Sequence, residues 1–170
     1  MAKILATGWI PEDIIGPCRE KFDEILLPSR EKGNFTQEEV WDVINNYDVL
    51  FTIAAFKFQK ELIDHATNIK VGCNLGVGYD NIDAAYCTEK KTAVINTPRA
   101  VCQPTAEYAV ALIMATMRGV LLYDREVRET HRTASINFFD RDIMLYGKTI
   151  GILGCGRIGR EVARKTHGLG

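Results

Sequence analysis

Short apolar segments alternate with longer segments of helical periodicity through the first hundred residues of the chain. The apolar segments are rich in Ile, Val, Leu and Phe and end at glycine, proline or polar residues, which is typical of strands. We predict strands at residues 4–7, 24–27, 48–54, 69–75 and 92–96. We predict helices between them, at residues 11–22, 36–44, 61–63 with their neighbours, and 83–91.

Two of these helices carry start signals in the sequence. Pro11, Glu12 and Asp13 suit a first helical turn, and Thr36 followed by Glu39 has the form of a capping box. Strands separated by helices are typical of parallel β-α-β units. We therefore predict an α/β fold for residues 1–99, a flavodoxin-like doubly wound parallel sheet that serves as a first domain.

The longest helical pattern begins at Pro104 and is expected to run to about Arg128. Such a helix would be about 40 Å long at 1.5 Å per residue. Its apolar residues cover more than one face, so either one large core or a sheet together with a second subunit would bury it. Residues 130–146 show no clear period and are predicted to form an interface arm or a flexible loop. Their large apolar and charged residues are Phe138, Phe139, Asp140, Arg141, Asp142 and Met144.

A glycine motif follows this segment. Residues 149–153 are apolar and predict a buried strand, after which Gly154, Gly156 and Gly159 match G-x-G-x-x-G. In a dinucleotide-binding turn the first glycine makes the turn, the second admits a pyrophosphate, and the third allows close packing of the helix. The helix that begins here would offer its free N–H groups to an anion. Dinucleotide binding is therefore favoured over a purely structural turn.

The composition of the chain argues against some classes of binding partner. The 170 residues are 46% hydrophobic and 25% charged, with a formal net charge of −1, which argues against a broad surface for nucleic acid. We recognise neither an apolar stretch long enough for a bilayer nor a secretory signal. We therefore expect a cytoplasmic protein without nucleic-acid or membrane partners. The five scattered cysteines predict reduced thiols rather than a disulfide or metal site.

Several segments resemble the D-isomer-specific 2-hydroxyacid dehydrogenase family in residue type, order and spacing, from about residue 70 to the end. Arg99 departs from the family, since glycine is usual there, and so does the absence of tryptophan after Arg128. The matching segments are Gly76-Val77-Gly78-Tyr79-Asp80-Asn81-Ile82-Asp83, Asn96-Thr97-Pro98, Thr105-Ala106-Glu107, Asp124-Arg125-Glu126-Val127-Arg128, and residues 147–159.

The resemblance implies an oxidoreductase that transfers hydride between a nicotinamide dinucleotide and a small 2-oxo or 2-hydroxy acid in a cleft between two domains. The cofactor would be NAD, with NADP as the open alternative. The resemblance places the substrate carboxylate on the N–H groups of Val77 and Gly78, which a glycine-rich turn can offer as an anion nest. From the broad apolar surface of the long helix we also expect a homodimer through residues 104–146. The residues that the resemblance assigns to the cofactor are Thr105, Gly154, Gly156, Arg157, Ile158 and Gly159.

The resemblance places the catalytic arginine, carboxylate and histidine beyond residue 170, so we assign neither a catalytic residue nor a metal ligand. His65, His131 and His167 are interpreted as surface or structural residues. We expect residues 1–99 to lack their C-terminal return, residues 100–170 to form an incomplete dinucleotide-binding domain, and the chain alone to be inactive. A non-catalytic dinucleotide-sensing or dimerisation module is the alternative. Arg99 either favours an acidic substrate tail or is simply solvated.

Overall fold

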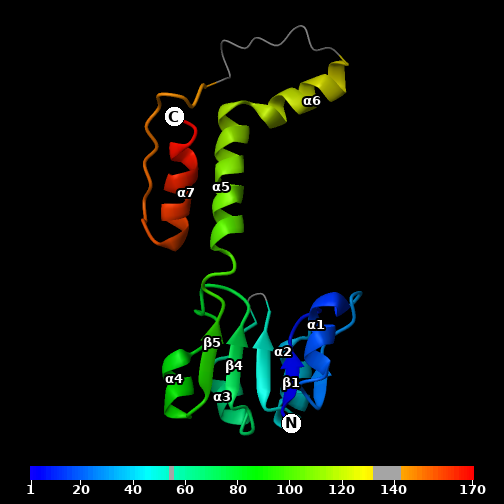
Figure 1. Ribbon diagram of the computed structural model, residues 1–170. Coiled ribbons are helices and arrows are strands. Elements are labelled where there is room, and N and C mark those ends of the chain that lie inside the picture. Colours follow the sequence, from blue (N-terminus) through cyan, green and yellow to red (C-terminus); the bar gives the residue numbers. More distant parts are fainter. Residues whose placement is uncertain (54–55, 132–142) are drawn as a thin grey trace. The chain divides into compact units, whose positions relative to one another are not determined.

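The computed structural model describes residues 1–53, 56–131 and 143–170, and the chain divides into two compact units, Met1–Arg99 and Ala100–Gly170. The first unit contains a five-stranded parallel sheet with the order β2-β1-β3-β4-β5 (Figure 1). This is the flavodoxin-like order, so the predicted α/β fold is confirmed. The strands are β1 Lys3–Ala6, β2 Glu24–Leu26, β3 Val49–Thr52, β4 Val71–Asn74 and β5 Ala93–Asn96.

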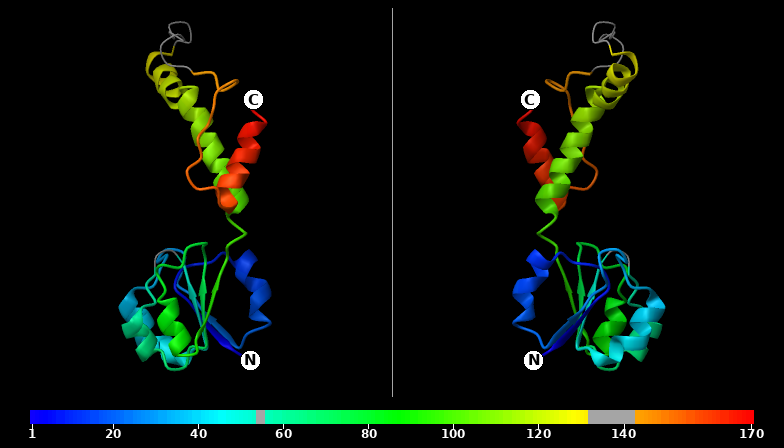
Figure 2. Two further views of the ribbon diagram at one scale, coloured as in Figure 1. Left: turned by 90° about the vertical axis from the view of Figure 1, so that its left-hand side faces the viewer. Right: turned by 90° about the vertical axis from the view of Figure 1, so that its right-hand side faces the viewer.

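The helices of the first unit are shared unequally between the two faces of the sheet (Figure 2). One face carries α1 (Glu12–Arg19), and the other carries α2 (Gln37–Val43), α3 (Lys60–His65) and α4 (Ala84–Glu89). A 3-10 turn, η1 (Ile44–Asn46), follows α2. The main core joins the strands to the three-helix face. Its fully buried members are Leu5, Val40, Ile44, Leu50, Phe58 and Cys87.

The start signal that the sequence predicted for α2 is confirmed, because its side chains bond the backbone of the same helical turn. The hydroxyl of Thr36 accepts a hydrogen bond from the N–H of Glu39, and the Glu39 carboxylate accepts one from the N–H of Thr36. This reciprocal pair is the predicted capping box, and it satisfies two N–H groups at the start of α2. The face that carries α1 is more open. An apolar cavity of about 540 Å³ lies there, between α1 and strands β1, β3 and β4.

The described residues of the second unit form three helices, α5 (Cys102–Met117), α6 (Val120–Thr130) and α7 (Arg157–His167), with α7 packed along α5. The prediction of one continuous helix from Pro104 to about Arg128 is wrong. Gly119 adopts a φ of 59°, and a left-handed residue of this kind ends a helix because it breaks the hydrogen-bond ladder. The two parts are bent by 56° at this break.

Among the described residues no single helix is long and apolar enough to cross a membrane. α5 and α6 pass that test only when taken together across their bend.

Residues 149–153 form an extended segment, but the predicted buried strand is not present. Ile150 is 42% exposed and Leu153 is fully exposed. The described part of the chain provides no strand beside this segment, so its amides have no ladder to join. Most of the predicted irregular arm, including Phe138, Phe139, Asp140, Arg141 and Asp142, lies outside the described residues.

Candidate functional site

The loop that follows β4 is held to the sheet by its carbonyl groups. The Gly76 carbonyl accepts hydrogen bonds from the N–H and hydroxyl of Thr97, at 2.9 and 3.3 Å. The Val77 carbonyl accepts one from the side-chain amide of Asn96 at 2.8 Å. The Gly78 carbonyl accepts one from the side-chain amide of Asn74 at 2.6 Å. Three successive peptide groups are therefore anchored on their oxygen side.

The anchored carbonyls decide where the loop amides point. A trans peptide group is planar, with its N–H directed opposite to its C=O, and the described chain has no cis peptide bond. The amide of Val77 therefore points away from Thr97, and the amide of Gly78 points away from Asn96. Within residues 1–53, 56–131 and 143–170 neither N–H has an acceptor. Both predicted substrate-binding amides are thus left available to an anion.

A buried polar pair supports this loop from below. Asn74 is 4% exposed and Thr52 is completely buried. The amide oxygen of Asn74 accepts hydrogen bonds from the Thr52 hydroxyl at 2.7 Å and from the side chain of Asn81 at 3.0 Å. Asn81 also donates to the carbonyl of Phe56 at 2.9 Å. All these polar groups are satisfied, so the network is a rigid base for the loop rather than a cost to stability.

Our sequence prediction missed Asn74 and gave no role to Asn96, although Asn96 stands in one of the matching segments. For Asn74 the available signal was an asparagine at the end of an apolar strand, which pattern reading treats as the start of a loop. Arg99, the last residue of the first unit, is exposed.

The second unit holds the glycine turn. Gly154 adopts a φ of +97°, which favours glycine, and Gly156 is the N-cap of α7 with a φ of −77°. A Cβ on Gly159 would lie 2.2 Å from the carbonyl oxygen of Gly154, so residue 159 must be glycine for α7 to approach the turn this closely. The third glycine therefore has the packing role that the motif implies.

The start of α7 is suited to an anion. The N–H groups of Arg157, Ile158 and Gly159 have no acceptor in the part of the chain that the structure describes. No acidic side chain occupies the first turn of α7, and Arg157 adds a positive charge there. Free amides and the positive end of the helix dipole both stabilise a phosphate at such a position.

Polar contacts between α5 and α7 hold this helix start in place. Lys165 on α7 forms an ion pair with Glu107 on α5 at 3.1 Å. Arg164 hydrogen-bonds the Glu161 carboxylate and, together with Gln103 on α5, holds its pKa below the ordinary value. Thr105, the residue predicted to lie near a nicotinamide ring, is exposed on the first turns of α5. The described residues thus bring Thr105 and the glycine turn into the same unit.

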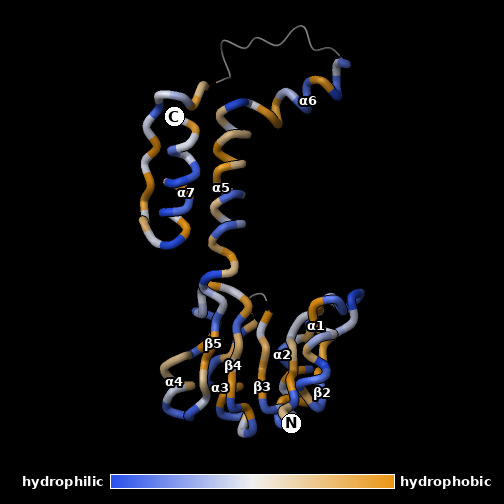
Figure 3. The backbone as a smooth tube through the Cα atoms, viewed as in Figure 1, coloured by the Kyte–Doolittle hydropathy of each residue, from blue (hydrophilic) through white to orange (hydrophobic). Residues whose placement is uncertain are grey.

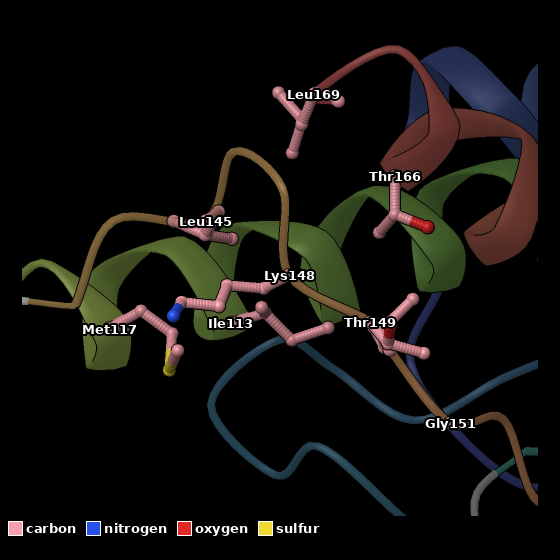
Figure 4. A pocket seen from close by; sticks show the side chains of 10 residues that line it. Ile113, Met117, Leu145, Lys148, Thr149, Gly151, Thr166 and Leu169 are labelled. Carbon is pink, nitrogen blue, oxygen red and sulfur yellow. The ribbon is translucent and has the colours of Figure 1, made fainter.

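A separate pocket in this unit does not contain the predicted cofactor residues. It has a volume of about 420 Å³ and lies between α5, the extended segment and the end of α7 (Figure 4). Its lining is mostly apolar, with Ile113 and Met117 from α5, and Lys148 contributes a charged side chain. This pocket lies beside residues 149–151, which pair with no strand in the described part of the chain.

The histidines take structural positions. The His65 ring stacks on Trp41 with 4.0 Å between ring centroids, and its Nε2 lies 2.9 Å from the Trp41 carbonyl. His131 caps the end of α6, and His167 ends α7. The described residues contain no group of three or more His, Cys, Asp or Glu side chains that could hold a metal ion. The five cysteines, all of them within the described residues, are thiols outside any disulfide, and Cys155, inside the glycine turn, is exposed.

A comparison with known proteins shows which family the chain matches. Residues 4–159 match the model of the D-isomer specific 2-hydroxyacid dehydrogenase catalytic domain. The chain is 34% identical to a glyoxylate reductase of Thermococcus gammatolerans, over 99% of its own length and 51% of the relative's. It thus spans about half the length of the curated relatives it matches.

Two solved structures have the same fold. A protein of Thermus thermophilus is 25% identical with a TM-score of 0.88, covering 98% of this chain and 53% of that one. A 2-hydroxyacid dehydrogenase of Ketogulonicigenium vulgare is 26% identical with a TM-score of 0.73, covering 99% of this chain and 52% of that one.

Proposed function

The chain belongs to the D-isomer specific 2-hydroxyacid dehydrogenase family, and from this premise we propose that its protein transfers hydride between a nicotinamide dinucleotide and a small 2-oxo or 2-hydroxy acid. The observation that carries the proposal is the glycine turn. Gly159 lies against the Gly154 carbonyl, and the free amides of α7 begin immediately beside it. Phosphate recognition needs this combination of a close backbone approach and an open helix start. A D-isomer product and a cytoplasmic location are further parts of the proposal.

The cofactor would be NAD, with NADP as the alternative, and when bound it would supply or accept the hydride. Gly154, Gly156 and the first turn of α7 would hold its pyrophosphate through backbone N–H groups, and Arg157 would add charge. The absence of an acidic side chain from that turn fits an anionic ligand. Thr105 would lie beside the nicotinamide.

The substrate carboxylate would bind to the amides of Val77 and Gly78. Carbonyl reduction also needs a proton donor beside the substrate oxygen. None of the described residues is assigned that role, because His65 is stacked against Trp41 and the other histidines end helices. We therefore propose that the 170-residue chain by itself binds ligands without turning them over.

Cys155 provides a direct test of cofactor placement. Since Cys155 is the exposed cysteine of the described chain and lies inside the glycine turn, N-ethylmaleimide should modify it first. A bound pyrophosphate would cover the turn, so NADH should slow this modification about tenfold or more once its concentration exceeds the dissociation constant tenfold. Peptide mass spectrometry at fixed times measures the rate. AMP without the second phosphate is the control ligand, and equal protection by both, or none by NADH, would contradict the placement.

Homodimerisation through residues 104–146 is a further part of the proposal, and it also supports the alternative function of a dimerisation module. Hydrophobic residues recur along both helices of this region (Figure 3). Several of the large ones are exposed. They include Tyr108 and Leu112 on α5 and Val120, Leu121 and Leu122 on α6. Exposed apolar patches of this kind mark association surfaces.

Replacing Leu112 and Leu121 together with glutamate should weaken dimerisation at least about a hundredfold, because each change removes an apolar contact and buries a charge. Sedimentation velocity across a concentration series measures the dissociation constant. Ile14→Glu, an equally exposed apolar position on α1, is the matched control and should not change it. A monomeric parent chain at high concentration would refute the dimer.

A further inference from the structure

Polar residues form a row across the carboxyl end of the sheet on the face that α2, α3 and α4 cover. Thr52 on β3 pairs in register with Asn74 on β4, and Asn74 pairs with Asn96 on β5. Residues that are register partners project to the same side of a sheet. Thr52 and Asn74 belong to the small set of buried polar residues in the described chain. Such a row costs stability unless each member is bonded, so its role needs an explanation.

The two asparagines of this row hold consecutive peptide groups of the loop. Asn96 donates to the Val77 carbonyl at 2.8 Å, and Asn74 donates to the Gly78 carbonyl at 2.6 Å. The oxygen of Asn74 is already used by Thr52 and Asn81, so its NH₂ group must face the loop. The Asn74 side chain therefore has one orientation that satisfies all its partners.

We propose that Asn74 and Asn96 act together as a positioning clamp for the carboxylate-binding amides. By holding the Val77 carbonyl, Asn96 fixes the direction of the Gly78 N–H in the same peptide group. By holding the Gly78 carbonyl, Asn74 fixes the direction of the Tyr79 N–H, which has no acceptor among the described residues. The clamp thus adds Tyr79 as a third amide donor beside Val77 and Gly78. Preorganised amides bind an anion without a reorganisation cost.

This inference rests on the proposed function, since the anion is taken to be the carboxylate of a 2-oxo acid. The glycine turn belongs to the other unit of the chain. Loss of the clamp should therefore affect the 2-oxo acid and leave the dinucleotide alone. A merely structural role for the asparagines would instead lower stability and weaken both ligands together.

The test is steady-state kinetics of the whole enzyme with glyoxylate and NADH, since we propose that the 170-residue chain by itself does not turn ligands over. In Asn96→Leu, which keeps the branching of the side chain but removes the donor, KM for glyoxylate should rise about tenfold, as expected for one lost hydrogen bond. KM for NADH and the melting temperature should stay at the parent values. Asn74→Asp, which keeps the acceptor for Thr52 but loses the donor, should also raise KM for glyoxylate and leave KM for NADH unchanged, while its buried carboxylate lowers the melting temperature. Thr97→Val should have a smaller effect, because the Thr97 N–H still holds the Gly76 carbonyl.

An unchanged KM for glyoxylate in both asparagine variants, or equal changes in both Michaelis constants, would overturn the clamp while leaving the proposed function standing. If the parent protein does not reduce glyoxylate with NADH or NADPH, the proposed activity on that acid fails, and amide resonances then decide the clamp. Oxalate should shift the ¹⁵N–¹H signal of Gly78 in the parent chain but not in Asn96→Leu. No shift in the parent would overturn it.

Discussion

Phe58→Ala is expected to lower the free energy of unfolding of the first unit by about 3–5 kcal/mol, the range for removing a large aromatic from a core. Phe58 is the largest fully buried side chain of the chain's described residues. Its ring lies against β4, since a Cβ on Gly72 would be 3.4 Å from two of its carbon atoms. Alanine leaves a cavity between the sheet and the α3–α4 layer that neighbouring side chains cannot fill without moving.

Urea unfolding followed by tryptophan fluorescence measures this effect cleanly, because both tryptophans, Trp9 and Trp41, belong to the first unit. Ile14→Ala is the control, as Ile14 is exposed on α1 and its loss should change stability by less than about 0.5 kcal/mol. The backbone bonds between Phe58 and residues 81–83 remain in the alanine variant. A loss below about 1 kcal/mol would therefore show that the ring is not packed as described.

The fold of the first unit could be predicted because its signals are local and repeated. Each strand is an apolar run bounded by polar or glycine residues, and each parallel connection requires a helix. The capping box at Thr36 shows the same principle at the level of one turn, since both of its hydrogen bonds join neighbours in sequence. Periodicity therefore predicted the elements, and the short connections then limited the strand order.

The helix break at Gly119 shows where periodicity is insufficient. The apolar repeat continues through Val120 and Leu121, so the hydrophobic pattern alone predicts one helix. The break depends on the backbone of a single residue, whose φ of 59° costs glycine little. A glycine inside a helical pattern is compatible with either outcome, and tertiary packing decides between them.

The prediction of a buried strand at residues 149–153 was wrong for a different reason. Burial of a strand is a property of its neighbours, and the described chain supplies none beside Ile150 and Leu153. The asparagine clamp was missed because its hydrogen bonds join residues that are close only after β4 and β5 have paired. The family resemblance implied a role for the amides of Val77 and Gly78, but the side chains that bond this loop belong to the sheet.

Gly159→Ala is expected to reduce affinity for NADH about a hundredfold and to loosen α7 from the glycine turn. The added Cβ would stand 2.2 Å from the Gly154 carbonyl oxygen, and Gly154 cannot easily move because its φ of +97° is already confined to glycine geometry. Overpacking of this kind costs about 1–3 kcal/mol, and each 1.4 kcal/mol lost from binding is tenfold in affinity. Fluorescence titration with NADH measures the affinity, and thermal unfolding by circular dichroism measures the loss of stability.

Gly156→Ala tests whether a ligand occupies the glycine turn without disturbing the fold of that turn. A Cβ on Gly156 meets nothing within 4 Å, and its φ of −77° suits any residue, so the melting temperature should not change. Affinity for NADH should still fall about tenfold or more if a pyrophosphate occupies that space, because a methyl group would displace it. Gly168→Ala, at the other end of α7 and with only ordinary contacts, should alter neither property.

If Gly156→Ala binds NADH like the parent, the pyrophosphate does not lie against Gly156. If Gly159→Ala keeps the parent melting temperature, the close approach of α7 to the turn is wrong.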